Sequence, residues 1–386
     1  MRVLVCCVQV CVLTRTRDRP DRCCSTVATS KRRGLIAVRV ASGTCALSLL
    51  IWTFHGVDLG RVGESITSIS VYGLALIALP ALTALVLECL GWSRVFKSLG
   101  QGVGLRPLLR VRLMTEAVAQ TLPLGVIWAE SLKPMLLGRH AAMPASRAVA
   151  GLFARKYLLV SSQALYVALL SGLGFATLCR LSGALTGHTA FAWAAFAVSG
   201  VLCLLALGLC GTFACGRAAE RVLALLRRIP NARLQRGLLR REASFARTDS
   251  LTERYFALSF AHTTLLPGVF FLCGWLCEAL ESFLILRLLG VELDFFAVAS
   301  IEVLLSFLKN VLFVLPAGLG VQDVGYVSCL TALGVPDALT TGAAFSALKR
   351  GKELFWAGVG YALLASDLRP ALAAGAAPAQ NEVLTA

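Results

Sequence analysis

The chain has 386 residues, of which 57% are hydrophobic and 15% are charged, and its net charge is +16. A soluble domain carries about 25% charged residues, so this composition excludes an ordinary soluble protein and indicates a polytopic membrane protein. The longest polar segment, 211–255, is too short to enclose a sizeable core of its own. Because the basic stretches lack interleaved aromatic residues, the positive charge favours cytoplasmic loops and anionic lipid contacts over nucleic-acid binding.

Residues 1–37 are predicted to form a cytoplasmic N-terminal extension. They contain an apolar run, but arginine and aspartate follow it where a signal peptide has a small-residue cleavage site. An unstructured or misassigned start is favoured here over a targeting element.

Apolar segments predict an all-α membrane protein with about six to eight spans. In chain order they are 38–54, 66–92, 157–179, 189–211, 264–289, 295–315, 324–348 and 354–366. Each of the longer segments approaches the roughly 20 residues that a spanning helix needs. The expected transmembrane domain is therefore 38–366, with a first half at 38–180, a second half at 189–366, and a C-terminal tail at 367–386.

The distribution of Lys and Arg orients the predicted spans. Basic residues greatly outnumber acids in 1–40, 92–156 and 212–256, but not in 287–353 or 55–68. The first three regions are therefore expected to face the cytoplasm and the other two to face outward. This predicts a multi-pass membrane protein with a cytoplasmic N-terminus.

A short motif occurs twice, as "LPLGVIWAE" at 122–130 and "LPAGLGVQD" at 315–323. Each copy has a carboxylate, Glu130 or Asp323, seven residues after its proline, and a basic pair follows further on: Arg155–Lys156 or Lys349–Arg350. The odd number of spans between the copies predicts an inverted repeat, which is typical of transporters.

Proline and glycine within each motif predict that the helix breaks there into a re-entrant or unwound segment. The helix-break candidates are Pro123, Gly125, Pro316, Gly318 and Gly320. Such a backbone persists at membrane depth only when it is buried in protein or lines a wet cavity. The alternative is a pair of ordinary interhelical turns, each with a solvated carboxylate.

Ionisable residues elsewhere in the apolar segments are costly in a bilayer and need partners or access to water. Glu302, Ser306 and Lys309 lie on one helical stripe that can hold an internal ion pair, and Lys349, Arg350 and Glu353 can pair within one turn. Lys352 is expected to extend toward an interface. The candidate residues of a polar cleft are Glu116, Gln120, Glu130, Lys133, Arg155, Lys156, Glu278, Glu281, Gln322, Asp323, Lys349, Arg350 and Glu353.

Nothing in the sequence predicts a metal site, a cofactor or a catalytic residue. The fourteen cysteines and four histidines are scattered. Cys273 and Cys277 lie four residues apart on an apolar segment, which favours packing over ligation.

At these motifs the sequence resembles the lysylphosphatidylglycerol synthase transmembrane-domain family, also called flippase-like. The resemblance rests on "LPAGLGVQDVGY" with "ALKRGKELFWAGVG", and on "VRLMTEAVAQTLPLGVIWAESLKPMLLGRHAAMPASRAVAG", and it covers roughly 40–370. The glutamine before the acid is most similar to hopanoid-biosynthesis-associated members. The sequence departs from the family pattern at Trp128, Ala129 and Ala317, where glycine is usual, and at Asp323, where glutamate is usual.

The resemblance implies a lipid-handling membrane protein, and three functions follow from it. The first is a flippase-like lipid transporter or export subunit, in which basic groups bind an anionic or polar headgroup and acids balance them or carry protons. The second is a non-catalytic accessory subunit of a complex that modifies a hopanoid or glycolipid. The third is a membrane enzyme acting on a lipid. The synthases add a cytosolic aminoacyl-transfer domain, and this chain is not expected to be that enzyme by itself.

Overall fold

The computed structural model describes residues 48, 55–122, 125–228, 235, 242–258, 261–311 and 320–375. Within these ranges the regular structure is helical and contains no strand. The helices are α3 (Leu59–Thr67), α4 (Val71–Ser98), α5 (Leu105–Thr121), α6 (Gly125–Ala141), α7 (Ala145–Leu173), α8 (Phe175–Thr186), α9 (Ala190–Ala214), α10 (Ala218–Arg227), α12 (Glu242–Ala257), the π-helical turn η1 (Ala261–Leu265), α13 (Leu266–Leu288), α14 (Phe295–Val311), α15 (Val321–Ala332) and α16 (Ala338–Gly375).

The architecture is that of an all-α, multi-pass membrane protein, as the sequence predicts. Four helical segments of the described chain are long and apolar enough to cross a bilayer: Val71–Ser98, Ala145–Leu173, Ala192–Ala214 and Thr263–Leu288. Helix α14 contains a shorter apolar stretch, Phe295–Ser306. Helix α16 is the longest at 38 residues, but its central turns carry Lys349, Arg350, Lys352 and Glu353. Apart from residue 48, the predicted span 38–54 lies outside the described residues.

Several predicted boundaries differ from the observed helices. The predicted span 157–179 is wrong at its start, because α7 begins at Ala145. The sequence pattern assigned the basic residues before 157 to a loop, whereas Arg155 is buried and paired within the bundle. The predicted apolar block 324–348 contains the turn between α15 and α16, and α16 continues to Gly375, past the boundary expected at 366.

The helix order repeats: α4–α7 in the first half corresponds to α13–α16 in the second. Helices α4 and α13 pack antiparallel along their length, since Gly73 near the start of α4 faces Leu288 at the end of α13. Gly91, near the end of α4, faces Phe271 near the start of α13, and a Cβ there would lie 3.0 Å from the ring. The corresponding first helices of the two halves therefore run in opposite directions, as an inverted repeat requires.

Both helix breaks occur at the two motifs. Helix α5 ends at Thr121 and α6 begins at Gly125, where a Cβ would lie 2.3 Å from the carbonyl oxygen of Ala119. Only glycine fits this turn. The two helices fold back as a hairpin, because Gln101 before α5 donates to the carbonyl of Ala141 at the end of α6 at 3.2 Å. Pro123 lies outside the described residues.

The second motif leads into α15, which begins at Val321, and of the motif residues before that helix only Gly320 is described. Gly320 has φ +82°, a left-handed conformation that favours glycine. Its N–H donates to Asp323 Oδ2 at 3.0 Å, so the carboxylate caps the start of α15. Pro316 and Gly318 lie outside the described residues.

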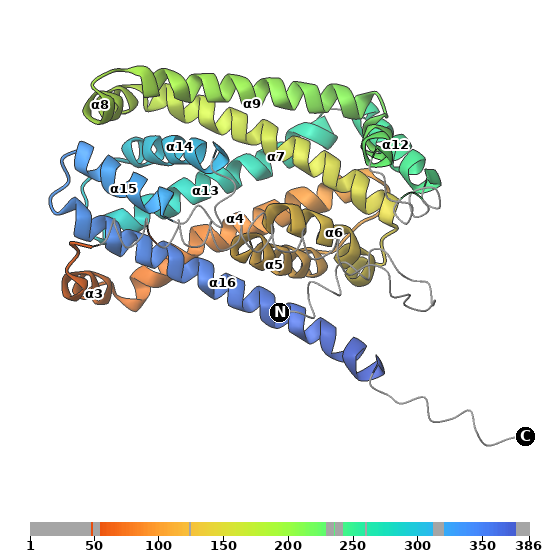
Figure 1. Cartoon of the computed structure of the whole chain (residues 1–386), viewed down its shortest axis with the longest axis horizontal. Coiled ribbons are helices and arrows are strands. Elements are labelled where there is room, and N and C mark those ends of the chain that lie inside the picture. The colour runs from red at the N-terminus through yellow and green to blue at the C-terminus, as the bar shows by residue number, and fades with distance from the viewer. Residues whose placement is uncertain are drawn as a thin grey trace, which may run out of the picture.

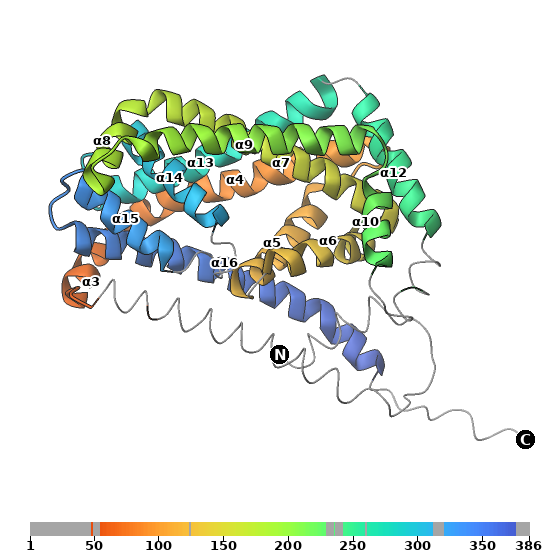
Figure 2. The ribbon, with the colours of Figure 1, turned by 45° about the horizontal axis from the view of Figure 1, so that its top comes forward.

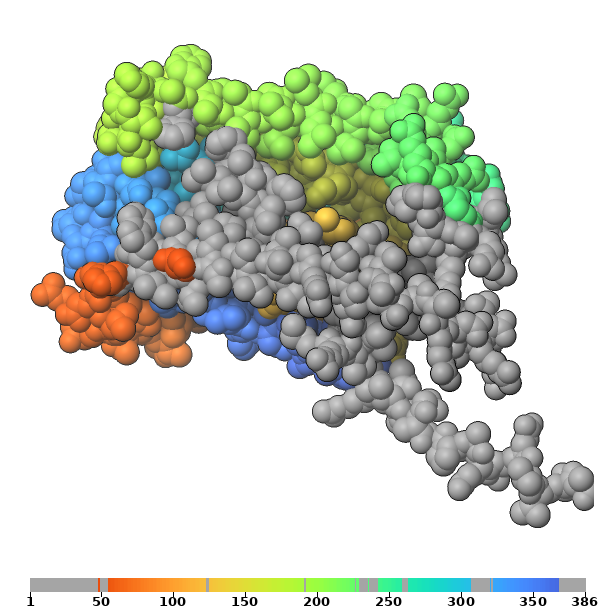
Figure 3. All heavy atoms as spheres, viewed as in Figure 1, coloured from red at the N-terminus to blue at the C-terminus, as the bar shows by residue number. Residues whose placement is uncertain are grey.

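Apolar clusters hold the bundle together. One lies mainly in the first half and includes Trp92, Phe96 and Leu158, and another lies mainly in the second and includes Ile285, Tyr326 and Phe345. Helix α16 joins the halves: it packs on α15 and then crosses to α5 (Figure 1). Helices α8 and α9 form one long edge of the molecule, which is also visible in the space-filling view (Figure 3).

The far end of α16 is fixed to the first half by Asp367, which is 7% exposed. Arg110 of α5 donates to its Oδ1 at 2.7 Å, and His140 of α6 lies 2.5 Å from its Oδ2. Arg139 donates to the backbone carbonyl of the same residue at 2.5 Å. The end of the last helix is thus fastened to both arms of the first hairpin.

Two buried charge clusters as the candidate functional site

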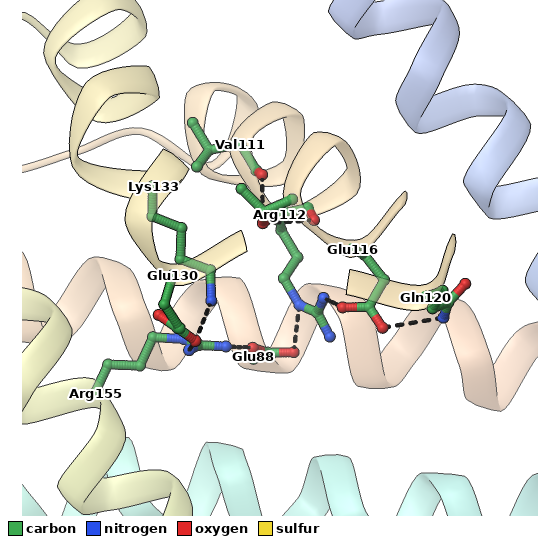
Figure 4. A network of polar contacts seen from close by, with 9 residues as sticks. Glu88, Val111, Arg112, Glu116, Gln120, Glu130, Lys133 and Arg155 are labelled. Carbon is green, nitrogen blue, oxygen red and sulfur yellow. Dashed lines mark hydrogen bonds and ion pairs between the residues drawn. The ribbon is translucent and has the colours of Figure 1, made fainter. Parts of the chain in front are cut away.

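The first charge cluster consists of Glu88, Arg112, Glu116, Gln120, Glu130, Lys133 and Arg155, contributed by α4, α5, α6 and α7 (Figure 4). Glu88 lies at its centre. It accepts a hydrogen bond from Arg112 Nε at 2.8 Å and another from Arg155 Nη2. Its side chain is 15% exposed and that of Arg155 is 5% exposed. Glu88 therefore compensates two guanidinium groups that little water reaches.

An aromatic ring supports the same centre. The guanidinium carbon of Arg155 lies 5.2 Å from the centroid of Trp92, which is fully buried one turn after Glu88 on α4. This distance is typical of a cation–π contact. A carboxylate and an aromatic ring of α4 thus both contact Arg155, and together they fix the orientation of its guanidinium group.

Two carboxylates lie at the more open edge of the first charge cluster. Glu116 pairs with Arg112 and accepts from Gln120 Nε2 at 3.0 Å. Glu130 accepts from Lys133 Nζ at 2.7 Å and lies 3.8 Å from Arg155 Nη1. Their side chains are 33% and 35% exposed, against 6% for Lys133. The edge accessible from outside therefore consists of paired carboxylates, with the basic groups behind them.

The second charge cluster consists of Glu281, Ser282, Glu302, Gln322, Asp323, Tyr326, Lys349, Arg350, Lys352 and Glu353, from α13 to α16. Lys349 Nζ lies at its centre. It donates to Glu302 Oε1 at 2.7 Å and to the hydroxyl oxygens of Ser282 and Tyr326, each at 2.9 Å. Ser282 and Tyr326 also donate to Glu302. Lys349 Nζ, Glu302 Oε1 and the hydroxyl groups of Ser282 and Tyr326 thus each have a partner from another helix.

Beside Lys349, the motif acid Asp323 is bound on two sides. Its Oδ2 caps Gly320 and accepts from Arg350 Nη2 at 3.3 Å, and the same guanidinium donates to Gln322 Oε1 at 3.3 Å. Arg350 Nη1 donates to Glu353 Oε2 at 2.6 Å, the pair within one turn that the sequence predicts. Asp323 is 2% exposed, so the alternative of a solvated carboxylate is wrong at this copy.

Lys352 forms a fourth ion pair in the second charge cluster. Its Nζ lies 2.5 Å from Glu281 Oε1, and the glutamate side chain is only 2% exposed. The sequence did not predict this partner; the lysine side chain itself is 25% exposed. A buried carboxylate on α13 attracts the ammonium group across the helix interface, and that attraction outweighs hydration of the lysine.

Equivalent positions of the two halves carry the two clusters. The same interval in the sequence separates Glu88 from Glu281, Glu130 from Asp323, and Lys133 from Tyr326. Arg155 and Lys349 begin the two basic pairs and each pairs with an acid. Each half thus holds a carboxylate shortly after a helix break and a cation from the following long helix.

Two candidates are more exposed than the rest. Lys156 is exposed on α7, and Glu278 is exposed on α13 although Glu281 is buried one turn later. Glu302 pairs with Lys349 of α16, an ion pair between helices that the sequence did not predict. The side chain of Lys309 is outside the described ones, so the ion pair expected within α14 stays a prediction.

Glu88 and Arg112 were not predicted as site residues, and neither were Glu302 and Tyr326. Glu88 had a usable signal, since it is the lone acid in the apolar segment 66–92. Arg112 had a weaker one, its spacing of four residues from Glu116. For Tyr326, only the fold reveals that its ring and hydroxyl face Lys349, whose Nζ lies 5.1 Å from the ring centroid.

Comparison with known proteins identifies the family. The model of the lysylphosphatidylglycerol synthase TM region matches residues 34–350. The chain belongs to this family. No curated protein and no solved structure matches the chain. The family match confirms the resemblance read from the two motifs and makes this a membrane lipid-related protein.

Proposed function

We propose that the protein moves a polar or anionic lipid between the leaflets of the bacterial inner membrane. The observation that carries this proposal is the pair of charge clusters at equivalent positions of two halves whose first helices are antiparallel. Packing alone does not call for so many buried ions, because replacing a buried ion pair with apolar residues is often neutral or stabilising. Intramembrane ionisable groups generally mark a pathway for polar substrates.

The ion pairs of the first charge cluster could open to bind a lipid headgroup, with the headgroup replacing one carboxylate. Arg155 is held by Glu88 and lies 3.8 Å from Glu130, whose side chain is 35% exposed. A headgroup phosphate can take the place of Glu130 in bonding to this guanidinium, since arginine binds phosphate with two parallel hydrogen bonds. Lys133 would then balance the displaced carboxylate.

The proposed path follows from the inverted orientation. Each hairpin is proposed to enter the bilayer from one face as a re-entrant segment, with α5–α6 on the cytoplasmic side and α14–α15 on the outer side. Rocking of one half against the other would then expose one cluster at a time. The N-terminus lies in the cytoplasm in this arrangement, which agrees with the excess of Lys and Arg in 92–156 and 212–256.

The lipid assay uses the full chain in liposomes that contain phosphatidylglycerol labelled on its acyl chain with a dithionite-sensitive fluorophore. Lipid exchange lets dithionite bleach more than the outer-leaflet half of the signal. We expect exchange with the unchanged protein and strong loss with Arg155→Lys, which keeps the charge but not the bidentate geometry. Lys97→Gln, on an exposed side chain at the end of α4, is the matched control.

Two outcomes would refute the proposal: folded, unchanged protein that bleaches only the outer leaflet for every lipid tried, or a chemical change in the lipid. The first would favour an accessory subunit and the second an enzyme. Topology is tested separately with single cysteines at Gly102 and Glu292, which lie in the loops before the two hairpins. Labelling of both from the same side of the membrane would contradict the inverted path.

A further inference from the structure

Helix α10 has one face that is well packed and another that is not. Ala219 and Leu223 are 1% and 5% exposed, and Asp249 of α12 accepts hydrogen bonds from the N–H groups of Ala219 and Glu220 at 2.7 and 2.9 Å. Away from this contact, Val222 is 46% exposed and Leu225 is 70% exposed. The two apolar side chains lie one turn apart and form a continuous exposed strip.

A basic stripe runs directly beside that strip. Arg217, Arg221 and Arg228 are all exposed, and their spacing of four and seven residues puts them on one side of the helix. At 100° per residue, this stripe is adjacent to Leu225 and turned away from Leu223. A surface with an apolar strip flanked by arginines is typical of a helix lying in a membrane interface.

The position of α10 relative to the membrane supports the same interpretation. The candidate span in α9 ends at Ala214, and α10 begins at Ala218 after a turn in which Gly216 has φ +59°. Figure 2 shows α10 crossing the end of the bundle next to the end of α9, in a different direction from that helix. Because α10 directly follows a candidate span, we expect it at the level where lipid headgroups begin.

From these observations we infer that α10 is an anchor on the membrane surface that binds acidic phospholipid headgroups. Leu225 and Val222 insert between acyl chains, while Arg217, Arg221 and Arg228 contact phosphates of the same leaflet. Arg227 belongs to a different contact, since its Nη2 lies 3.0 Å from Glu242 of α12. The inference does not depend on lipid transport.

The test measures backbone hydrogen exchange of segment 218–228 with the full chain in nanodiscs. One set contains phosphatidylcholine alone and the other also contains phosphatidylglycerol. We expect slower exchange with phosphatidylglycerol, by about fivefold for each arginine that contacts the anionic surface. Added salt should remove most of this difference, because the charges are exposed.

Variants separate the α10 surface from general charge attraction. Arg217→Gln with Arg221→Gln should remove most of the effect of phosphatidylglycerol. The matched control, Arg247→Gln with Arg254→Gln, removes the same charge from exposed positions of α12 and should leave the effect intact. Leu225→Asn should speed exchange in both membranes, because it removes the apolar anchor.

The inference is overturned if exchange in α10 is the same in both membranes, or if the α12 control loses the effect equally. Protection that persists in detergent and rises with protein concentration would instead assign the surface to a second copy of the chain. Lipid exchange in the dithionite assay is an independent readout, so failure of one proposal leaves the other testable.

Discussion

Glu88 provides the sharpest test of the first charge cluster. Glu88→Gln keeps the shape of the side chain and removes its charge, which leaves Arg112 and Arg155 without the carboxylate between them. The side chains of these arginines are 20% and 5% exposed, so neither is well hydrated. Arg155 therefore has little access to bulk water, and repulsion between the two guanidinium groups adds to the loss.

The magnitude follows from the cost of breaking a buried ion pair. Removing one partner typically costs 3–5 kcal/mol, because an uncompensated buried charge is left behind. Glu116 and Glu130 remain near the two arginines at 33% and 35% exposure and partly compensate them. We therefore expect a loss near the lower limit, about 3 kcal/mol in the free energy of unfolding.

The assay is reversible unfolding of the purified chain in mixed micelles, followed by the loss of helical circular dichroism. Glu292→Gln, in the exposed loop between α13 and α14, is the control and should change stability by less than about 0.5 kcal/mol. The double variant Glu88→Gln/Arg155→Gln should lose less stability than the sum of the losses of the two single variants, by about 0.5–3 kcal/mol. A Glu88→Gln variant as stable as the control, or strictly additive losses, would refute the assignment of Glu88 as the centre of the cluster.

Three further predictions use contrasts within the fold. Lys352→Met should lower the free energy of unfolding by about 3 kcal/mol, because it leaves the Glu281 carboxylate unpaired at 2% exposure. Glu281→Gln should lower it by only about 1 kcal/mol, because the lysine left behind is 25% exposed and can be hydrated. Equal losses for the two variants would contradict this reasoning. Gly151→Ala should lower the free energy of unfolding by about 1–3 kcal/mol, since its Cβ would lie 2.3 Å from a buried phenylalanine ring. Gly172→Ala, on the same helix, places its Cβ in open space and should leave stability unchanged or raise it slightly. Asp367→Asn should speed hydrogen exchange selectively in the last turns of α16, because it weakens the contacts of residue 367 with Arg110 and His140. Unchanged exchange there would contradict the role of Asp367 in fixing this end of α16 to the first hairpin.

Much of the fold was predictable because it depends on composition and on local spacing. The apolar segments identified a helical membrane protein, and four of them correspond to helices long enough to span a bilayer. Glycine marked both breaks for local reasons: a Cβ at Gly125 would collide with the preceding turn, and Gly320 has a positive φ. The pair Arg350–Glu353 was predictable as well, because residues three apart meet on any α-helix.

Helix ends were less predictable where charge and burial disagree. The start of α7 was placed too late because Arg155 has the composition of a loop residue. Only its contacts with Glu88 and Trp92 make a guanidinium acceptable inside the bundle. The continuation of α16 past residue 366 likewise depends on Asp367 finding cations on α5 and α6.

By itself, the sequence determined that this is a helical membrane protein with two Pro/Gly breaks, each followed by a carboxylate and, further on, a basic pair. The tertiary structure decided the partners. Lys349 bonds to Glu302 on α14, and Lys352 bonds to Glu281 on α13. Spacing along one helix is fixed by its 3.6-residue turn, but which faces of different helices meet depends on the packing of the whole bundle.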